Sequence, residues 1–430
     1  MAQENIEKLE RPDAHFDVAI VGGGMVGISL ALLLAEQQGL KILLIESQSM
    51  AVQSATQPIY SPSFDARSTA LSWASRKIYQ SVGLWDRLQL HLSDITQIHV
   101  SDRGHGGLTR MTADDADADV EALGYVVENR WLGSVLLEHL NQSKVEVHMN
   151  SEVAEFKPLS SGMQMHLKRG DSSNSELENH LVEASLVVIA DGAESQTAQK
   201  LGIYSDTTSY NQTAIIANVE LGKSHNGIAY ERFTDQGPMA LLPLSDYDGQ
   251  HRSALVWARP TEIAEQLMAS NDADFLHSLQ KQFGYRLGRF KNIGERGSYP
   301  LALGIANEQV RRNVLLMGNS AHSLHPVAGQ GFNLSLRDAA ALASIVQRAR
   351  EDSRPIGSLE VLEEYYQEQL SDQRNTLMFS DSLTKSFGHS SSLAALWRNA
   401  GLLTLDLIPG LRQRFARFGM GMSNTEAKHG

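Results

Sequence analysis

Gly22 to Gly27, GGGMVG, place glycines where a short apolar run turns into a helical pattern. The run 16–21, FDVAIV, predicts a buried strand, and the apolar residues of 25–38 predict a helix. A second buried strand, KILLI, is predicted over 41–45. Strand, tight turn, helix and strand in this order form a βαβ unit with parallel strands and a right-handed crossover. The chain is therefore constrained to an α/β fold that contains a parallel sheet.

Three glycines of this turn have distinct predicted tasks. Gly22 permits the tight turn after the strand, and Gly24 lets a pyrophosphate approach the backbone. Gly27 lets the helix pack closely against the sheet. The helix start, at Met25 and Val26, offers free N–H groups and a partial positive charge to the phosphates. The turn therefore predicts a dinucleotide site.

Glu46 ends the second predicted strand, about 20 residues after Gly27, which is the spacing of a ribose-binding acid. Its carboxylate can accept hydrogen bonds from both ribose hydroxyls of an adenosine, and its charge repels a 2′-phosphate. The alternative is a generic βαβ unit with a surface glutamate. The unit leaves the choice between NAD and FAD open.

Composition excludes several classes of function. The chain has 430 residues, 42% hydrophobic residues, a net charge of −13 and no cysteine. This length and core favour two or three folded domains, or one large domain with an insertion, and the charge, without a long basic run, argues against nucleic acid as a partner. Without cysteine there is no disulfide, Cys-ligated metal or thiol nucleophile, and we expect a cytoplasmic protein. Residues 1–15 are polar and are expected to form a disordered tail rather than a signal peptide.

A second glycine-rich turn lies late in the chain. Gly318-Asn319-Ser320-Ala321-His322 follows a predicted buried strand over 311–317, and 326–333 reads PVAGQGFN before a helix expected from about Leu334. The Asn319 amide can reach a ribityl chain. Backbone N–H groups of 329–333 suit the electron-rich edge of a reduced flavin. This turn selects FAD over NAD. Its predicted cofactor contacts are Asn319, Gly329, Gln330, Gly331, Phe332 and Asn333.

The pattern of the remaining chain predicts how the parallel sheet is divided. Runs rich in β-formers, separated by turn residues, indicate an antiparallel sheet inserted into the FAD-binding domain. Helices are expected over 68–82 and 132–142, and a buried strand over 181–190. We expect a discontinuous Rossmann-like FAD-binding domain (16–90, 120–205 and 300–350), a substrate domain (91–119 and 206–299) and a helical C-terminal region (351–430).

The chain resembles the p-hydroxybenzoate-hydroxylase-like, class A FAD monooxygenases from about Phe16 to Gln373, and within them the ubiquinone-biosynthesis hydroxylases. Three motifs carry the family resemblance: the N-terminal glycine turn, a middle Asp-Gly and the late glycine turn. The likeness to the ubiquinone branch rests on five strings: FDARSTAL (64–71), VSDRGH (100–105), YERFT (230–234), GPMALLP (237–243) and HPVAGQGFN (325–333).

The resemblance implies further cofactor contacts. Arg67 matches an arginine that reaches the FAD phosphates, Asn129 and Arg130 fall where the family contacts the flavin or its phosphates, and Asp191-Gly192 matches the Asp-Gly motif. Two departures stand out. An arginine that helps the reductant bind is replaced by Ala198, and the late motif begins Gly318-Asn319 where Gly-Asp is usual. The asparagine resembles the branch that acts on 2-polyprenyl-6-methoxyphenol.

The implied reaction is hydroxylation of that polyprenylated phenol, para to its hydroxyl, in ubiquinone biosynthesis. NAD(P)H would reduce the flavin, and O₂ would add to give a C4a-hydroperoxyflavin. Pro326, over the flavin, and His322 are the candidate catalytic residues. His322, His325 and Tyr299 are all left open as the base that deprotonates the phenol. No metal is expected, because the pair His322 and His325 lacks an evident third ligand.

Several alternatives remain at this point. The enzyme could act on another ring position, hydroxylate a small aromatic acid, work as a flavin dehydrogenase or reductase, or be a non-catalytic FAD-bound subunit of a biosynthetic assembly. An acid-binding enzyme would need an Arg or a pair of Ser on the substrate sheet, whereas GPMALLPL is apolar. Oligomerisation, other ubiquinone-biosynthesis proteins as partners, and peripheral contact of residues 393–418 with the inner membrane are also left open.

Overall fold

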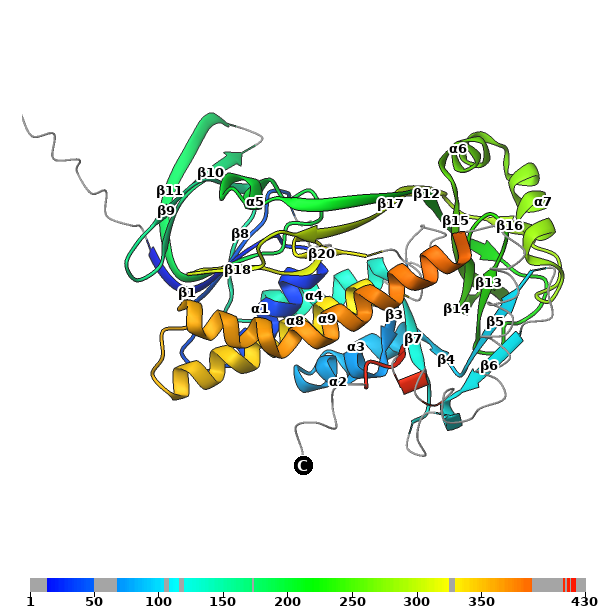
Figure 1. Cartoon of the computed structure of the whole chain (residues 1–430), viewed down its shortest axis with the longest axis horizontal. Coiled ribbons are helices and arrows are strands. Elements are labelled where there is room, and N and C mark those ends of the chain that lie inside the picture. Colours follow the sequence, from blue (N-terminus) through cyan, green and yellow to red (C-terminus); the bar gives the residue numbers. More distant parts are fainter. Residues whose placement is uncertain are drawn as a thin grey trace, which may run out of the picture.

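The computed structural model describes residues 14–49, 68–103, 108–115, 120–171, 174–324 and 329–388, together with 413, 416–417 and 419–422. Within these residues the chain forms an elongated molecule with one sheet at each end, a short sheet between them and a layer of long helices (Figure 1). The predicted mixed α/β architecture, with a parallel and an antiparallel sheet, is confirmed. Arg67, His325 and Pro326 lie outside the described residues.

The first sheet is built around the predicted βαβ unit. Its parallel strands follow the order β19, β11, β1, β2 and β8, with β18 antiparallel at one edge and β9 and β10 extending it as an antiparallel ribbon. Its strands are β1 (Ala14–Val21), β2 (Ile42–Ile45), β8 (Glu146–His148), β9 (Ser151–Pro158), β10 (Met163–Asp171), β11 (Asn174–Ile189), β18 (Val310–Arg311) and β19 (Val314–Leu316).

The second sheet is mostly antiparallel and lies at the far end of the molecule. Its order is β20, β17, β12, β15, β14, β13, β5 and β6, with β16 beside β12; β13 and β5 pair in parallel. Its strands are β5 (Gln97–Asp102), β6 (Leu108–Thr112), β12 (Ser205–Glu220), β13 (Ile228–Phe233), β14 (Met239–Tyr247), β15 (Gln250–Pro260), β16 (Asn292–Ile293), β17 (Gly297–Ala306) and β20 (His322–Ser323).

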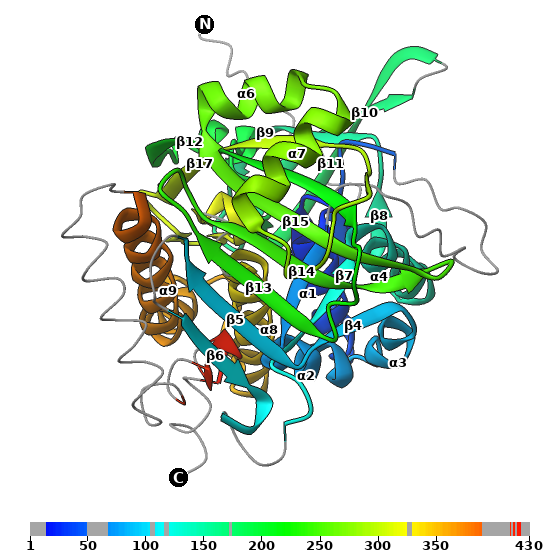
Figure 2. The same ribbon diagram turned by 90° about the vertical axis from the view of Figure 1, so that its right-hand side faces the viewer.

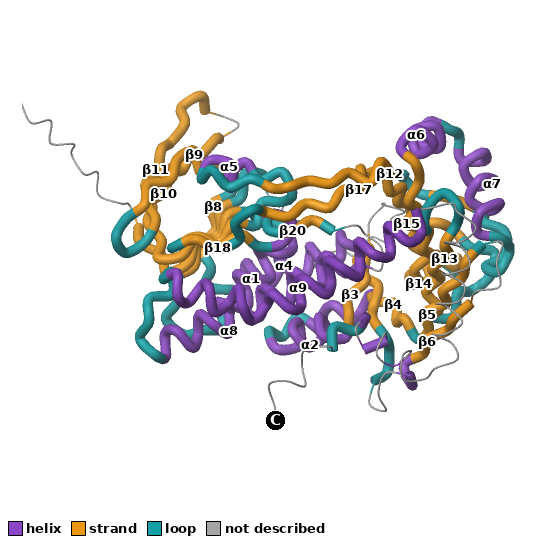
Figure 3. The backbone as a smooth tube through the Cα atoms, viewed as in Figure 1, coloured by secondary structure: helices purple, strands orange, loops and turns teal. Residues whose placement is uncertain are grey.

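One face of this second sheet is covered by two helices, α6 (Thr261–Ala269) and α7 (Asp272–Phe283), as Figure 2 shows. Phe275 and Leu279 of α7 pack with Leu241 and Trp257 in one buried apolar cluster. The other face is turned toward the helical layer, and the long strands β12 and β17 reach back toward the first sheet (Figure 3). One face of the sheet is therefore covered by α6 and α7, and the other face borders a cavity.

Long helices pack against the parallel sheet and join it to the short third sheet. Helices α1 (Met25–Ala35), α4 (Asn129–Gln142), α8 (Gln330–Glu351) and α9 (Leu359–Gly388) neighbour one another, and they share one apolar core with β1 and β2. The third sheet, β3 (Ser68–Ser72), β7 (Gly124–Glu128) and β4 (Leu92–Ile95), lies between the two larger ones. The shorter elements are α2 (Trp73–Ser81), α3 (Trp85–Leu88), α5 (Gln196–Lys200) and the 3₁₀ turns Gln89–His91, Ala113–Asp115 and Gly318–Ser320.

The prediction of one helix over 68–82 is wrong for its first five residues. Residues 68–72 form β3, which pairs with β7, and the helix begins at Trp73 because the Ser72 hydroxyl accepts the Ser75 N–H. Serine is a strong helix N-cap, since its oxygen satisfies an N–H that the helix leaves unpaired. The late helix begins at Gln330, four residues before the predicted Leu334.

No helix in the described part of the chain is both long enough and apolar enough to cross a membrane.

Candidate functional site

The predicted glycine turn opens into a cavity of about 930 Å³ at the carboxyl ends of the parallel strands. Ligands of doubly wound sheets bind at this edge. The cavity brings together three stretches that are far apart in the sequence: the first glycine turn with Glu46, the Asp-Gly motif and the late Gly-Asn motif. Of the predicted cofactor contacts, it is lined by Gly22, Gly24, Met25, Val26, Glu46, Asp191, Gly192, Asn319 and Phe332.

The backbone of the first turn shows why three positions hold glycine. Gly22 has φ +113°, and a Cβ there would lie 2.5 Å from the Ala190 carbonyl oxygen. A Cβ at Gly27 would lie 1.9 Å from the Gly22 carbonyl oxygen, so the helix touches the turn directly. A Cβ at Gly24, in contrast, would meet no atom within 4 Å and would point into open space. Gly22 and Gly27 therefore serve the fold, and Gly24 keeps the cavity free.

Glu46 is held at the wall of this cavity by backbone donors. The Gly23 N–H donates to its Oε2 at 2.6 Å, and the Gln48 N–H donates to its Oε1 at 2.8 Å. Carboxylate oxygens have more acceptor sites than these two bonds use. The fixed carboxylate can therefore still accept hydrogen bonds from a ribose diol.

Ser320 joins the Asp-Gly motif to the late turn. Its hydroxyl lies 3.1 Å from the Asp191 Oδ1 and accepts the Gly192 N–H at 3.1 Å. Lys200, which the sequence motifs did not single out, also lines the cavity, and its Nζ donates to the Val153 carbonyl at 2.5 Å. Ala198 is buried in the core beneath the cavity. A cation is thus available near the Asp-Gly motif, two residues after the position where the family pattern expects arginine.

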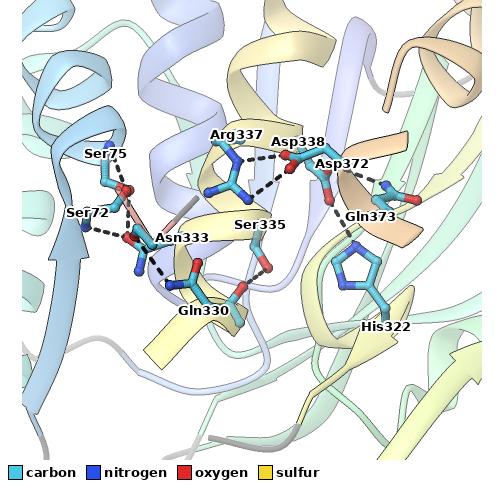
Figure 4. A network of polar contacts seen from close by, with 12 residues as sticks. Ser72, Ser75, His322, Gln330, Asn333, Ser335, Arg337, Asp338, Asp372 and Gln373 are labelled. Atoms are coloured by element: carbon cyan, nitrogen blue, oxygen red, sulfur yellow. Dashed lines mark hydrogen bonds and ion pairs between the residues drawn. The ribbon is translucent and has the colours of Figure 1, made fainter. Parts of the chain in front are cut away.

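The late glycine turn is fixed by the side chain of Asn333. Its Oδ1 accepts from the Ser72 N–H at 2.8 Å and the Ser75 hydroxyl at 2.7 Å (Figure 4). Its Nδ2 donates to the carbonyls of Ala70 and Gly329 at 2.8 Å. Asn333 is buried, so its side chain fastens the turn to β3 and α2. Because the side chain is used within the protein, the prediction that Asn333 contacts the cofactor now concerns only its backbone N–H group.

A second cavity, of about 300 Å³, lies between this turn and the open face of the antiparallel sheet. Ser68, Thr69 and Ala70 of β3, with Leu324 and the turn residues Gly329, Gly331 and Phe332, form one side. The other side is formed by Ile95 of β4 and by ten residues on or next to the antiparallel sheet: Ile98, Ala229, Glu231, Phe233, Pro238, Met239, Ala240, Leu242, Val256 and Ala258. Phe332 lines both cavities, so they adjoin at the turn.

Glu231 is the one ionisable side chain among the described residues that line the second cavity. Desolvation raises the pKa of its carboxyl to about 7. The motifs that predicted the cofactor site gave no reason to select it, although it lies in the string YERFT. Alternation along β13 was the available signal, because it places Glu231 on the same face as Ala229 and Phe233.

His322 lies behind the turn rather than in either cavity. Its Nε2 is 2.9 Å from the Asp338 Oδ2, whose other oxygen accepts from Gln373 at 3.1 Å; all three residues are buried (Figure 4). Asn129 accepts from the Thr69 hydroxyl at 2.6 Å and so lies next to the second cavity, and Arg130 is exposed at the start of α4. Gln330 is buried and donates to the Gly419 carbonyl at 3.4 Å.

Comparison with known families matches residues 15–379 to the FAD binding domain family. The chain is 33% identical over 410 residues to ubiquinone hydroxylase UbiL of Rhodospirillum rubrum, covering 95% of this chain and 90% of the relative. It is 31% identical to 3-demethoxyubiquinol 3-hydroxylase of Escherichia coli, covering 94% and 98%. Human ubiquinone biosynthesis monooxygenase COQ6 is 27% identical, covering 94% and 92%.

Solved structures share the fold at lower sequence identity. The p-nitrophenol 4-monooxygenase PnpA of Pseudomonas putida superposes with a TM-score of 0.74 at 20% identity, covering 94% of this chain and 97% of the other. PqsL of Pseudomonas aeruginosa, in complex with 2-aminobenzoylacetate, gives a TM-score of 0.71 at 21% identity, covering 91% and 100%. At this identity the likeness concerns the arrangement of sheets and helices.

Proposed function

The chain belongs to the FAD binding domain family and is an FAD-dependent monooxygenase; from this premise we propose that it hydroxylates the ring of a polyprenylated phenol in ubiquinone biosynthesis. The substrate of the proposal is 2-polyprenyl-6-methoxyphenol, oxidised para to its hydroxyl. O₂ is the oxygen donor and NAD(P)H the reductant. The names of the relatives support a hydroxylation step in ubiquinone biosynthesis, since both bacterial relatives and the human one are named for ubiquinone hydroxylation or biosynthesis.

The residues lining the 930 Å³ cavity fit FAD in their chemistry. Gly24 leaves open space where a pyrophosphate would meet the start of α1, and Glu46 is fixed where a ribose would lie. Lys200, Asp191 and Asn319 add a cation, an acceptor and an amide along the same wall. FAD, when bound, supplies the chemistry that activates O₂; the protein positions the ring and excludes water.

The composition of the second cavity is the observation that carries the choice of substrate. None of the described residues lining it is Arg, Lys or His, so these residues offer no cation to an aromatic carboxylate. Its sheet side is apolar except for Glu231, whose negative charge would repel an acid. Drug-sized ligands fill roughly 300–1,000 Å³. A cavity of about 300 Å³ accommodates an aromatic ring and the start of an apolar chain.

Asn319 and the apolar strand β14 support the ring position of the proposal by resemblance to the methoxyphenol branch. A second candidate, hydroxylation at another position of the same ring, is favoured by the similarity to 3-demethoxyubiquinol 3-hydroxylase. The two candidates share the cofactor, the apolar cavity and the class of substrate. They differ in the carbon that is oxidised and therefore in the intermediate that precedes the step.

Quinone-intermediate profiling after deletion of the gene in its native host tests the proposal. Accumulation of polyprenyl methoxyphenol, reversed by the wild-type gene but not by the Gly24→Val variant, is expected. Accumulation of a demethoxyquinone would move the reaction to another ring position. An unchanged quinone profile would overturn the proposed function.

A further inference from the structure

Glu231 is a carboxylic acid on an otherwise apolar patch of the antiparallel sheet. Its neighbours along β13 on the same face are Ala229 and Phe233, and its partners across the strands are Ala240 on β14 and Val100 on β5. All four are apolar, and the first three border the 300 Å³ cavity together with Glu231. The side chain is half-buried, and the cavity is where it can meet a ligand.

No hydrogen bond or ion pair joins the Glu231 carboxylate to any other described residue, and burial alone raises its pKa, to about 7. The elements that face it across the cavity contribute the hydroxyls of Ser68 and Thr69, which do not titrate, and no titratable group among the described lining residues. The nearby cations belong to the other face of the sheet: Arg232 donates to the Gln282 carbonyl at the end of α7, and Arg286 contacts His99. An unpaired acid that is partly desolvated is costly, and such groups concentrate at sites of function.

The cavity places this acid opposite the late glycine turn. Gly329, Gly331 and Phe332 form the facing wall, and Phe332 also lines the larger cavity. A phenol ring lying in the smaller cavity therefore has the turn on one side and the Glu231 carboxylate on the sheet side. Phenol hydroxyls donate hydrogen bonds, and a desolvated carboxylate is a strong acceptor.

We propose that Glu231 is a catalytic residue that accepts the hydrogen bond of the substrate's phenol hydroxyl and takes its proton as the ring is oxidised. This inference rests on the proposed function. The phenol O–H bond breaks and a carboxyl O–H bond forms on Glu231. The electron pair of the broken bond moves into the ring, whose carbon bonds to one oxygen atom of O₂ as the O–O bond breaks. The other oxygen atom leaves as water, with two electrons from NAD(P)H and two protons. The hydrogen displaced from that carbon leaves as a proton to solvent.

The other side chains considered as the base are less suitably placed. His322 is committed to Asp338 and lines neither cavity. Tyr299, on β17, is 40% exposed and does not line the smaller cavity. His325 lies outside the described residues.

A binding measurement on the FAD-loaded, oxidised protein tests this role without turnover. The probes are 2-decyl-6-methoxyphenol and its O-methyl ether, which has the same ring and chain but no hydroxyl proton. The ratio of their dissociation constants, measured by isothermal titration calorimetry between about pH 5.5 and 8.5, isolates the contribution of the hydroxyl. Glu231→Gln removes the charge, Glu231→Asp retains it, and Glu265→Gln makes the same change at an exposed position on α6.

In the wild type we expect the preference for the phenol over the ether to grow about tenfold as Glu231 ionises through pH 7, because hydrogen bonds to charged groups are worth more than neutral ones. The Glu231→Gln ratio should be independent of pH, whereas Glu231→Asp and Glu265→Gln should keep the rise. FAD content of each variant shows that it is folded.

Two results would overturn the inference, and they differ in what else they imply. If both probes bind with a pH-independent ratio in the wild type, or if Glu231→Gln keeps the rise, Glu231 does not receive the hydroxyl and the proposed function stands. If neither probe binds to the FAD-loaded wild type, the phenol substrate itself is wrong and this role fails with it.

Discussion

The two adjoining cavities differ in how they are built. The larger one is lined by backbone turns and several polar side chains, among them Glu46, Asp191 and Lys200. Among the described residues, the smaller one is lined mainly by apolar side chains of the sheet, with the hydroxyls of Ser68 and Thr69 and a single acid, Glu231. Phosphates, riboses and a ribityl chain need many hydrogen-bonding groups, whereas an apolar phenol needs only one. This difference supports the proposal that the cofactor occupies the larger cavity and the substrate the smaller one.

The largest expected effect separates cofactor binding from folding within one turn. Gly24→Val should lower FAD affinity at least about a hundredfold while the apoprotein stays folded, because the new side chain enters open space that the pyrophosphate needs. Gly27→Val is the matched control and should unfold the protein, since its Cβ would lie 1.9 Å from the Gly22 carbonyl oxygen. Flavin absorbance and circular dichroism distinguish the two. Normal FAD affinity in Gly24→Val would refute the assignment of the larger cavity.

Asn333→Ala tests whether the wall shared by the two cavities depends on one side chain. The change removes four hydrogen bonds and leaves the buried Ser72 N–H without its acceptor. We expect a loss of about 3 kcal/mol in the free energy of unfolding, measured with urea. Asn141→Ala, at an exposed position on α4, should change stability by less than about 0.5 kcal/mol. Equal effects would show that the turn is held by other contacts.

Glu231→Gln should stabilise the folded protein in a pH-dependent way. The folded pKa of about 7 lies above the unfolded value near 4.5. The carboxyl therefore costs nothing below about pH 4.5, and its cost grows as the pH rises to about 7 and then stays constant. Because the side chain is only half-buried, we expect a gain of about 2 kcal/mol for the glutamine variant at about pH 8 and none near pH 4.5. The same gain at both pH values would contradict the raised pKa.

Filling the smaller cavity should affect the substrate and spare the cofactor. Ala240 lines the cavity and is the cross-strand neighbour of Glu231, on β14. Ala240→Phe is expected to weaken binding of 2-decyl-6-methoxyphenol about tenfold, by occupying part of the 300 Å³, with unchanged FAD affinity. Calorimetry with the FAD-loaded variant measures both. A parallel loss of FAD would mean that the two cavities are not separate sites.

Sequence patterns predicted the larger cavity better than the smaller one. Gly22 to Gly27 and Glu46 belong to one local βαβ unit, whose geometry follows from the order of its elements. Glu231 and Ala240 meet only through strand pairing, and alternation alone does not say which face of β13 borders a cavity. Arg232, on the opposite face, looks equally functional in the sequence, yet it donates to the end of α7.

The misassigned strand β3 has a similar cause. Residues 68–72, STALS, hold only two apolar residues, which do not distinguish a strand from a helix, and their partner strand, Gly124–Glu128, is distant in the sequence. Ser72 was the usable local signal, because a serine before a helical pattern marks a helix start. Tertiary pairing decided the conformation of the residues before it.

Oxygen-isotope labelling tests the central claim, that a flavin in the larger cavity oxidises a phenol held in the smaller one. The FAD-loaded protein is supplied with NAD(P)H, oxygen-18-labelled O₂ and 2-decyl-6-methoxyphenol, and the product is analysed by mass spectrometry and NMR. The account predicts a dihydroxylated ring with one labelled oxygen atom on the carbon para to the original hydroxyl. Oxidation of NAD(P)H with no labelled phenol product would contradict it and indicate a flavin reductase.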